Sequence, residues 1–256
     1  MPEPSHAIPQ EGFPRVVVTR RAEQAPPFCD KLRAAGFTPL CFPTIQLEPL
    51  PALALNGALA KIETFDWLLF SSGNAIDFFF RRVRELNLAL RLPRTAVVGS
   101  ATAQKLAEYH IYPDFMPQTF TGEALAAGLG DLAGQQILLP RAQLGRPQIV
   151  AKLCSQGAEV TEIPLYNTVT AVPTPGALER LAAGFDAITF ASPSSVRGFL
   201  HIAGAKPIEP AVVACIGPVT AQTAVENGLA VTLMPDEYTL DGLVQVLAQH
   251  FARQPL

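Results

Sequence analysis

The sequence repeats itself at an offset of about 120 residues, and this repeat constrains the fold more than any other feature. The stretch FDWLLFSSGNAIDFFF at residues 65–80 recurs as FDAITFASPSSVRGFL at residues 185–200. Three further pairs of stretches match in the same way: 97–108 with 215–226, 119–125 with 237–243, and 16–43 with 137–164. Because four blocks recur at offsets of 118 to 121 residues, we predict that the chain is a duplicated unit.

Each copy alternates short apolar runs with amphipathic stretches. LLF at 68–70 is typical of a buried strand, and the apolar residues after it recur at i, i+3, i+4 and i+7, as on one helix face. We expect strands at 16–19, 38–42, 66–70, 95–99, 112–115, 137–140, 159–163, 186–190, 212–216 and 231–234. We expect helices near 22–35, 75–86, 102–109, 121–128, 147–156, 194–203, 220–227 and 239–252. Alternating strands and helices predict an α/β fold with two similar parallel-sheet lobes.

Two apolar, proline-rich stretches occupy equivalent places in the copies: FPTIQLEPLPALAL at 42–55 and IPLYNTVTAVPTP at 163–175. Proline disfavours helix, so both are expected to be extended connections between lobes. One lobe would then be 47–167, and the other would combine 1–42 with 172–256, leaving connections at 43–50 and 164–173. Spacing alone allows a simple tandem split near residue 130 equally well.

Composition excludes several classes of function. With 19 basic and 22 acidic residues, the net charge is −3 and no basic stripe exists to bind nucleic acid. No apolar run reaches membrane-spanning length, and the N-terminus does not resemble a secretory signal, so we expect a cytoplasmic protein. The four cysteines and four histidines are too scattered to predict a metal site, and the thiols are expected to be reduced. No phosphate-loop or dinucleotide fingerprint indicates a nucleotide cofactor.

The turns that follow four of the expected strands are rich in small hydroxyl residues: SSGN at 71–74, GSAT at 99–102, SPSS at 192–195 and GPVT at 217–220. In open α/β sheets, ligands bind at the carboxyl ends of strands, where helix N-termini favour anions. For any single turn, plain helix capping is the favoured explanation, because Ser, Thr and Asn are common N-caps in any protein. Four such turns in two lobes favour an acidic ligand held between the lobes.

Three arginines and one tyrosine stand near the same edges. Arg20 and Arg141 are repeat equivalents at strand ends, and Arg146 follows just before a helix. They are candidates for pairing with ligand carboxylates, although solvated or structurally paired arginines fit the pattern equally well. Tyr166 lies on the second connection, where the other copy has Ile45, so it is a candidate for the site or for packing.

The order and spacing of these motifs resemble the uroporphyrinogen-III synthase family from about residue 14 to about residue 250. The resemblance is carried by VVVTR, DWLLFSSGNAI, AVVGSATAQKL, ILLPRAQLGR, GAEVTEIPLYNT, DAITFASPSSV, ACIGPVTAQTA and EYTLDGLVQVL. It implies two flavodoxin-like or Rossmann-like domains joined by a two-stranded β connection. One domain is discontinuous in this family, which selects the lobe built from both chain ends over the tandem split.

The resemblance also implies the activity. Members of the family cyclise the linear tetrapyrrole hydroxymethylbilane to uroporphyrinogen III with inversion of ring D and loss of water, in haem and sirohaem biosynthesis. Such an enzyme is a cofactor-independent lyase whose main task is orienting a flexible substrate. A monomer is expected, with a transient contact with hydroxymethylbilane synthase. The alternative from the residues alone is a two-lobed, non-catalytic binding protein for a small acidic ligand.

The resemblance gives roles to individual residues. Tyr166 matches the family tyrosine thought to assist departure of the hydroxyl, as proton or hydrogen-bond donor. The substrate carries eight carboxylates; Thr102 and Thr220 match cleft threonines of the family, and Ser71, Ser72, Ser192 and Ser194 match its substrate-contacting turns. The strand-end and turn positions described above add Arg20, Asn74, Arg141 and Arg146 to the residues expected to bind it.

Overall fold

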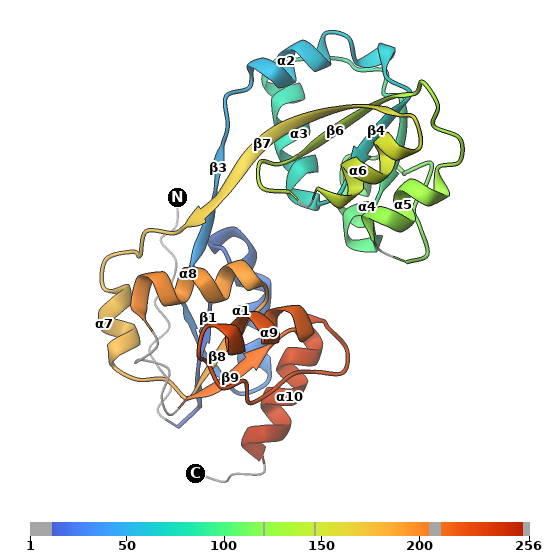
Figure 1. Ribbon diagram of the computed structural model, residues 1–256. Helices are drawn as coiled ribbons and strands as arrows, with labels where there is room; N and C mark the ends of the chain where they lie inside the picture. The colour runs from blue at the N-terminus through green and yellow to red at the C-terminus, as the bar shows by residue number, and fades with distance from the viewer. Residues whose placement is uncertain (1–11, 120, 146, 205–210, 253–256) are drawn as a thin grey trace. The chain divides into compact units, whose positions relative to one another are not determined.

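The computed structural model describes residues 12–119, 121–145, 147–204 and 211–252. The chain divides into two compact units (Figure 1). The first unit takes in the chain up to Gln46 and from Val169 onward, and the second is Leu47–Thr168. Each unit has four parallel strands with helices around them, so the α/β class predicted from the sequence is confirmed.

The sheet of the second unit has the strand order β3-β7-β6-β4-β5. Its strands are β3 (Ile45–Pro49), β4 (Trp67–Phe70), β5 (Arg94–Val97), β6 (Gln136–Ala142) and β7 (Glu159–Thr170). Its helices are α2 (Leu53–Leu59), the short 3-10 turn η2 (Ile62–Thr64), α3 (Gly73–Glu85), α4 (Ser100–Ala107), α5 (Gly122–Gly128) and α6 (Gln148–Ser155).

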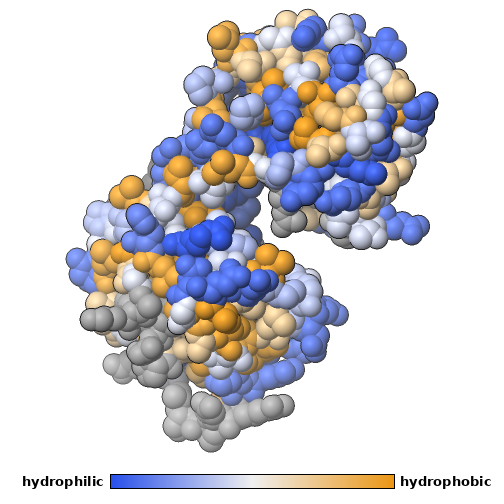
Figure 2. Space-filling view, viewed as in Figure 1, coloured by the Kyte–Doolittle hydropathy of each residue, from blue (hydrophilic) through white to orange (hydrophobic). Residues whose placement is uncertain are grey.

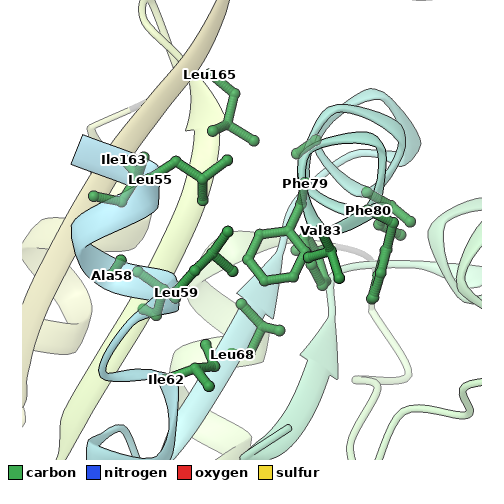
Figure 3. Close-up of a cluster of buried hydrophobic side chains, with 14 of the residues drawn as sticks. Leu55, Ala58, Leu59, Ile62, Leu68, Phe79, Phe80, Val83, Ile163 and Leu165 are labelled. Carbon is green, nitrogen blue, oxygen red and sulfur yellow. The ribbon is translucent and has the colours of Figure 1, made fainter. Parts of the chain in front are cut away.

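Side chains of β4 alternate between two separate cores on the two faces of this sheet. Leu68 and Phe70 pack with α2, α3 and α4 on one face, whereas Trp67 and Leu69 pack with α5 and α6 on the other. Figure 3 shows the first core, where labelled side chains from α2 and α3 converge on Leu68. Because both faces are covered, the run WLLF is apolar throughout, as is typical of a parallel strand buried on both sides.

The helix α3 forms where its sequence changes from a strand pattern to a helical one. Ser72 is its N-cap and accepts a hydrogen bond from the backbone N–H of Ala75 at 3.3 Å. Its buried face includes Phe79, which is fully buried and makes edge contacts with the rings of Phe70 and Phe80. The phenylalanines therefore hold α3 against the sheet.

The sheet of the first unit has the order β2-β1-β8-β9. Its strands are β1 (Arg15–Val18), β2 (Thr38–Cys41), β8 (Ala187–Phe190) and β9 (Val212–Cys215). Its helices are the short 3-10 turn η1 (Ala22–Gln24), α1 (Ala25–Ala34), α7 (Ala177–Ala182), α8 (Pro193–Ala203), α9 (Pro218–Glu226) and α10 (Leu240–Ala252). One core packs Val17 and Ile188 with α7, α8 and α9, and another packs Val16 and Val18 with α1 and α10.

An aspartate performs the same task at the start of the central strand pair in each unit. The carboxylate of Asp66 accepts the backbone N–H of Gln136 at 2.8 Å, and that of Asp186 accepts the N–H of Arg15 at 2.6 Å. Each bond pairs the residue before one strand with the first residue of its neighbour. These contacts help to set the register between β4 and β6 and between β8 and β1.

Two expected strands are wrong. Residues 112–115 and 231–234 contribute only isolated bridges, Ala96 to Phe115 and Ala214 to Leu233. In each segment a side-chain oxygen accepts a hydrogen bond from a backbone N–H of the neighbouring strand, in place of a backbone carbonyl. Asp114 accepts the N–H of Thr95, and Thr232 accepts the N–H of Val213. Pairing therefore ends after too few residues to make a strand.

The connections also differ from a purely extended chain. The segment expected to be extended over 42–55 turns into the helix α2 at Leu53, and α7 was not expected at all. The strand expected at 159–163 continues as β7 to Thr170. β3 lies beside β7 in the sheet. The Leu50 N–H donates to the Leu165 carbonyl and the Ala171 N–H to the Thr44 carbonyl, so the two chain segments are antiparallel.

The surface mixes polar residues with scattered apolar ones, as the orange residues among blue in Figure 2 show. The most exposed large apolar side chains include Leu53, Leu144 and Val172, which belong to different parts of the chain. None of the helices in the described part of the chain has the length and apolar character that crossing a membrane requires.

Phe79→Ala is expected to lower the free energy of unfolding by about 3–5 kcal/mol, because it leaves a cavity in a core that cannot close around it. Urea unfolding measures this change. Leu86→Ala, at the C-terminal end of the same helix and 36% exposed, is the control and should cost less than about 1 kcal/mol. Equal losses in the two variants would contradict the assigned role of Phe79.

Candidate functional site

The site of interest in the second unit lies where its strand order reverses. From β4 the chain moves outward to β5, then returns to place β6 on the other side of β4. The helix after β4 packs on one face of the sheet and the helix after β6 on the other. Loops leaving in opposite directions open a crevice at the carboxyl edge, the usual ligand position in such sheets.

A pocket of about 650 Å³ occupies this crevice. Ser71 lies on it directly after β4, Val98 directly after β5, and Arg141 near the end of β6. The first residues of α5 and α6 complete the lining, which consists of Ser71, Val98, Thr121, Gly122, Glu123, Arg141, Gln148 and Ile149. The predicted residues Ser71 and Arg141 are therefore brought together in one cavity.

Arg141 is a buried cation in this pocket, with its side chain only 7% exposed. Its Nη1 donates to Oε2 of Glu162 on the neighbouring strand β7 at 2.8 Å. The guanidinium also lies tightly against Gly145, since any side chain there would overlap its nitrogen atoms. A buried charge needs such partners. The structural ion pair offered as the alternative is thus present, and the binding of a ligand by Arg141 stays a prediction.

A β-bulge separates Arg141 from the next residue. Arg141 pairs with Pro164, but Ala142 pairs with Tyr166, so β7 carries an extra residue at this point. Bulges re-aim side chains, and they are frequent beside active sites. Tyr166 belongs to the core on the α3 face, while Arg141 lines the pocket beside α6.

Tyr166 is only 4% exposed, which is more buried than a residue on a connection was expected to be. Its ring stacks on that of Phe78, with the ring centroids 4.9 Å apart. The guanidinium carbon of Arg81 lies 4.3 Å from the centroid of the Phe78 ring. Its hydroxyl lies 3.1 Å from Oγ of Ser72. Packing and hydrogen bonding therefore hold the phenol in one orientation at the carboxyl edge.

Ser72 joins the helix cap to this phenol. The same Oγ that accepts the N–H of Ala75 contacts the Tyr166 hydroxyl. Its neighbour Ser71 is exposed and lines the pocket. Of the two predicted serines, one faces the cavity and the other supports Tyr166.

The first unit presents the equivalent turn after β8. Ser192 is the N-cap of α8 and forms a capping box with Ser195, and its Oγ lies 3.0 Å from that of Ser194. Thr44 donates to the carbonyls of Thr19 and Ser195, tying the turn to the end of β1. Of the two predicted serines in this turn, Ser192 caps the helix and Ser194 contacts the Ser192 hydroxyl.

Arg20 is placed just beyond β1 and does not make the carboxylate contact of Arg141. It donates to the backbone and side-chain oxygens of Gln24, both at 3.3 Å. Burial, and secondarily the nearby charge of Arg21, lowers the pKa of the Arg20 guanidinium. Additional negative charge beside Arg20 would relieve both effects.

The remaining candidates occupy helix starts. Asn74 is the second residue of α3 and half-buried, and Thr102 and Thr220 are the third residues of α4 and α9 and buried. Arg146 lies outside the described residues. No group of histidine, cysteine, aspartate and glutamate side chains that could hold a metal ion occurs among residues the structure describes.

Sequence reasoning missed Glu162, Phe78, Thr121 and Gln148. Glu162 contacts Arg141 and Phe78 contacts Tyr166, and both partners are distant in sequence, so no local pattern predicts these contacts. Thr121 was detectable, because it begins the expected helix at 121–128 and accepts the N–H of Ala124 as its N-cap. Gln148 gives no signal beyond its place at the start of α6.

Two parallel-sheet units, with helices on both faces and a pocket at a strand-order reversal, define a two-unit α/β protein of the doubly wound class. The family model described as Uroporphyrinogen-III synthase HemD matches residues 27–245. The chain therefore belongs to the uroporphyrinogen-III synthase family.

Relatives support this membership along nearly the whole chain. The uroporphyrinogen-III synthase of Synechococcus elongatus is 35% identical over 253 residues, covering 93% of this chain and 96% of that protein. The putative uroporphyrinogen-III synthase of Methanothermobacter thermautotrophicus is 30% identical over 91% of this chain and 97% of that protein.

Solved structures share the fold. Uroporphyrinogen-III synthetase of Helicobacter pylori matches with a TM-score of 0.66 at 18% identity, over 93% of this chain and 99% of that one. A mutant uroporphyrinogen III synthase of Thermus thermophilus matches with a TM-score of 0.65 at 20% identity, over 94% and 99%. At these identities the likeness concerns the fold alone.

Glu162→Gln is expected to destabilise the protein by about 1–3 kcal/mol, because it removes the carboxylate that the buried Arg141 guanidinium contacts. Urea unfolding measures the loss. Glu63→Gln, an exposed substitution of the same kind in the same unit, is the control and should change stability by less than about 0.5 kcal/mol. A neutral Glu162→Gln would show that the pair contributes nothing to stability.

Proposed function

We propose that this chain cyclises hydroxymethylbilane to uroporphyrinogen III, with inversion of ring D and loss of water. The proposal rests on membership of the family and, above all, on the pocket at the carboxyl edge of the second unit. This pocket contains a buried guanidinium, an exposed serine hydroxyl and the start of α6. These groups suit a substrate with many carboxylates.

Arg141 is the proposed anchor for one substrate carboxylate. Its contact with Glu162 holds the guanidinium in place. A ligand carboxylate next to the guanidinium would interact with the same positive charge as the Glu162 carboxylate does. Ser71 and Gln148 are the proposed neutral donors at the same carboxylate. The turns carrying Thr102, Ser192, Ser194 and Thr220, together with Arg20 and Asn74, are proposed to bind further carboxylates.

Tyr166 is the proposed acid. Departure of the terminal hydroxyl as water takes a proton from the phenol and leaves an azafulvene cation, which closes through a spiro intermediate. The proton lost from carbon when the ring closes returns to the phenolate, so the balance is one water released. The contact with Ser72 and the stack on Phe78 orient the phenol before the substrate arrives.

We propose that no cofactor takes part. The electron-rich pyrrole itself stabilises the cation formed when the hydroxyl departs, so the protein needs to orient the chain ends and supply one proton donor. This places the enzyme among the lyases.

We also propose that the two units are the two domains of a duplicated chain, 1–42 with 172–256 and 47–167, joined by 43–50 and 164–173. The sequence repeat matches four strands of the first unit, β1, β2, β8 and β9, with β6, β7, β4 and β5 of the second. With this matching, the order β2-β1-β8-β9 of the first sheet becomes β7-β6-β4-β5, which is the order in the second sheet. The aspartate contacts of Asp66 and Asp186 correspond as well. Both observations support a common ancestor for the units.

The activity is tested by adding the pure protein to freshly made hydroxymethylbilane and separating the uroporphyrin isomers after oxidation. The III isomer should dominate, without added metal or nucleotide. Accumulation of the spontaneously formed I isomer alone would refute the proposed activity and leave a non-catalytic binding protein as the remaining interpretation.

Tyr166→Phe is expected to lower kcat by about 10²-fold or more, because the variant keeps the ring stack but loses the proton donor. Steady-state kinetics and circular dichroism together measure activity and folding. Tyr112→Phe, at a side chain 76% exposed in the same unit, is the matched control and should retain full activity. A fully active Tyr166→Phe enzyme would remove the phenol from the mechanism.

A further inference from the structure

A pair of cysteines lies outside the site described above. Cys29 is in α1 and Cys41 is the last residue of β2, and their Sγ atoms lie 3.0 Å apart. Formation of a disulfide would require the sulfurs to approach by about 1 Å more. The sequence predicts reduced thiols and contains no C-x-x-C motif, but the fold brings these two cysteines into contact.

The two thiols differ in access. Cys29 is 1% exposed and packs in the core of the first unit, while Cys41 is exposed to solvent. A reagent in solution therefore reaches Cys41 first. Cys29 lies directly behind it, in the position of a second thiol that attacks once the first has reacted.

The charges around the pair favour a thiolate at Cys41. The positive charges of Arg33 on α1 and Arg180 on α7 lower the pKa of Cys41. Arg33 lowers the pKa of Cys29 as well, and the negative charge of Asp30 on α1 raises it. The hydrogen bond between the two sulfur atoms, followed by these arginines, lowers the pKa of Cys41 to about 7, although burial opposes the shift. The same hydrogen bond and burial raise the pKa of Cys29. Cys41 is thus the thiol that reacts near neutral pH, whereas Cys29 keeps its proton there.

We propose that Cys29 and Cys41 form a redox-modification site that takes low-molecular-weight disulfides such as oxidised glutathione. The Cys41 thiolate attacks one sulfur of the disulfide, giving a mixed disulfide and releasing one glutathione thiolate. Cys29 then attacks Cys41 Sγ, expelling the second glutathione, which takes up the proton of Cys29. Two protein thiols lose two electrons in total, and one molecule of oxidised glutathione gains them.

The other cysteines provide an internal comparison. Burial raises the pKa of Cys215 to about 12, so it is unreactive. Cys154 is exposed but lies on α6 of the other unit, without the partner thiol that Cys41 has. Only the pair in the first unit combines an exposed thiolate with a thiol behind it, among the residues that the structure describes.

The test uses the full chain, reduced, then equilibrated in native buffer with rising proportions of oxidised glutathione and quenched with N-ethylmaleimide. Peptide mapping should find residues 29 and 41 linked to each other, and dithiothreitol should reverse the link. Cys41→Ser should lose the link entirely. Cys29→Ser should instead hold glutathione on Cys41, and Cys154→Ser should behave as the wild type.

A second measurement follows the alkylation rate of Cys41 by iodoacetamide as pH rises. The wild type should show a midpoint near pH 7. In Cys29→Ala, which removes the hydrogen-bonding partner of Cys41, a midpoint returning towards the usual value of about 8.5 would cut the rate at pH 7 by about tenfold or more. The proposal is overturned if residues 29 and 41 of the native protein stay unlinked at every glutathione ratio, or if their link forms only after denaturation.

Discussion

In a parallel sheet with helices on both faces, a crevice opens at the carboxyl edge where the strand order reverses, and the candidate site of this protein depends on that crevice. Where the strand order reverses, beside β4 and β6, neighbouring loops leave the carboxyl edge in opposite directions. The gap between them becomes the pocket that Ser71 and Arg141 line. Ser71, Arg141 and Gln148 face this cavity, whereas Tyr166 packs in the core on the α3 face of the sheet, where Ser72 contacts its hydroxyl.

Much of the fold could be predicted from the sequence because the strands and helices carry different periods. The switch from WLLF to the spacing of Ile76, Phe79 and Val83 located β4 and α3 closely. The pattern failed at 112–115, where the Asp114 carboxylate takes over a backbone bond. The pattern of apolar residues cannot reveal this hydrogen bond, because it depends on the Asp114 side chain reaching the backbone of Thr95.

The candidate site was predictable only in outline. Strand-end positions located Ser71 and Arg141, since carboxyl edges follow from the α/β class itself. The partner Glu162, the stack of Phe78 on Tyr166 and the bulge beside Arg141 all arise from how β6 and β7 pair. Register is a property of two strands together, so it leaves little trace in either segment alone. Tyr166 was recognised as unusual, but its depth of burial was not.

Ser72 carries one more consequence, which concerns how such a site can evolve. A single hydroxyl both begins α3 and contacts the phenol of Tyr166. Under the mechanism proposed above, selection on catalysis and selection on folding would act on the same atom, so a change at this position would affect both traits. A lineage that replaced the serine would need compensating changes at two separate places, so the residue is pleiotropic in the genetic sense.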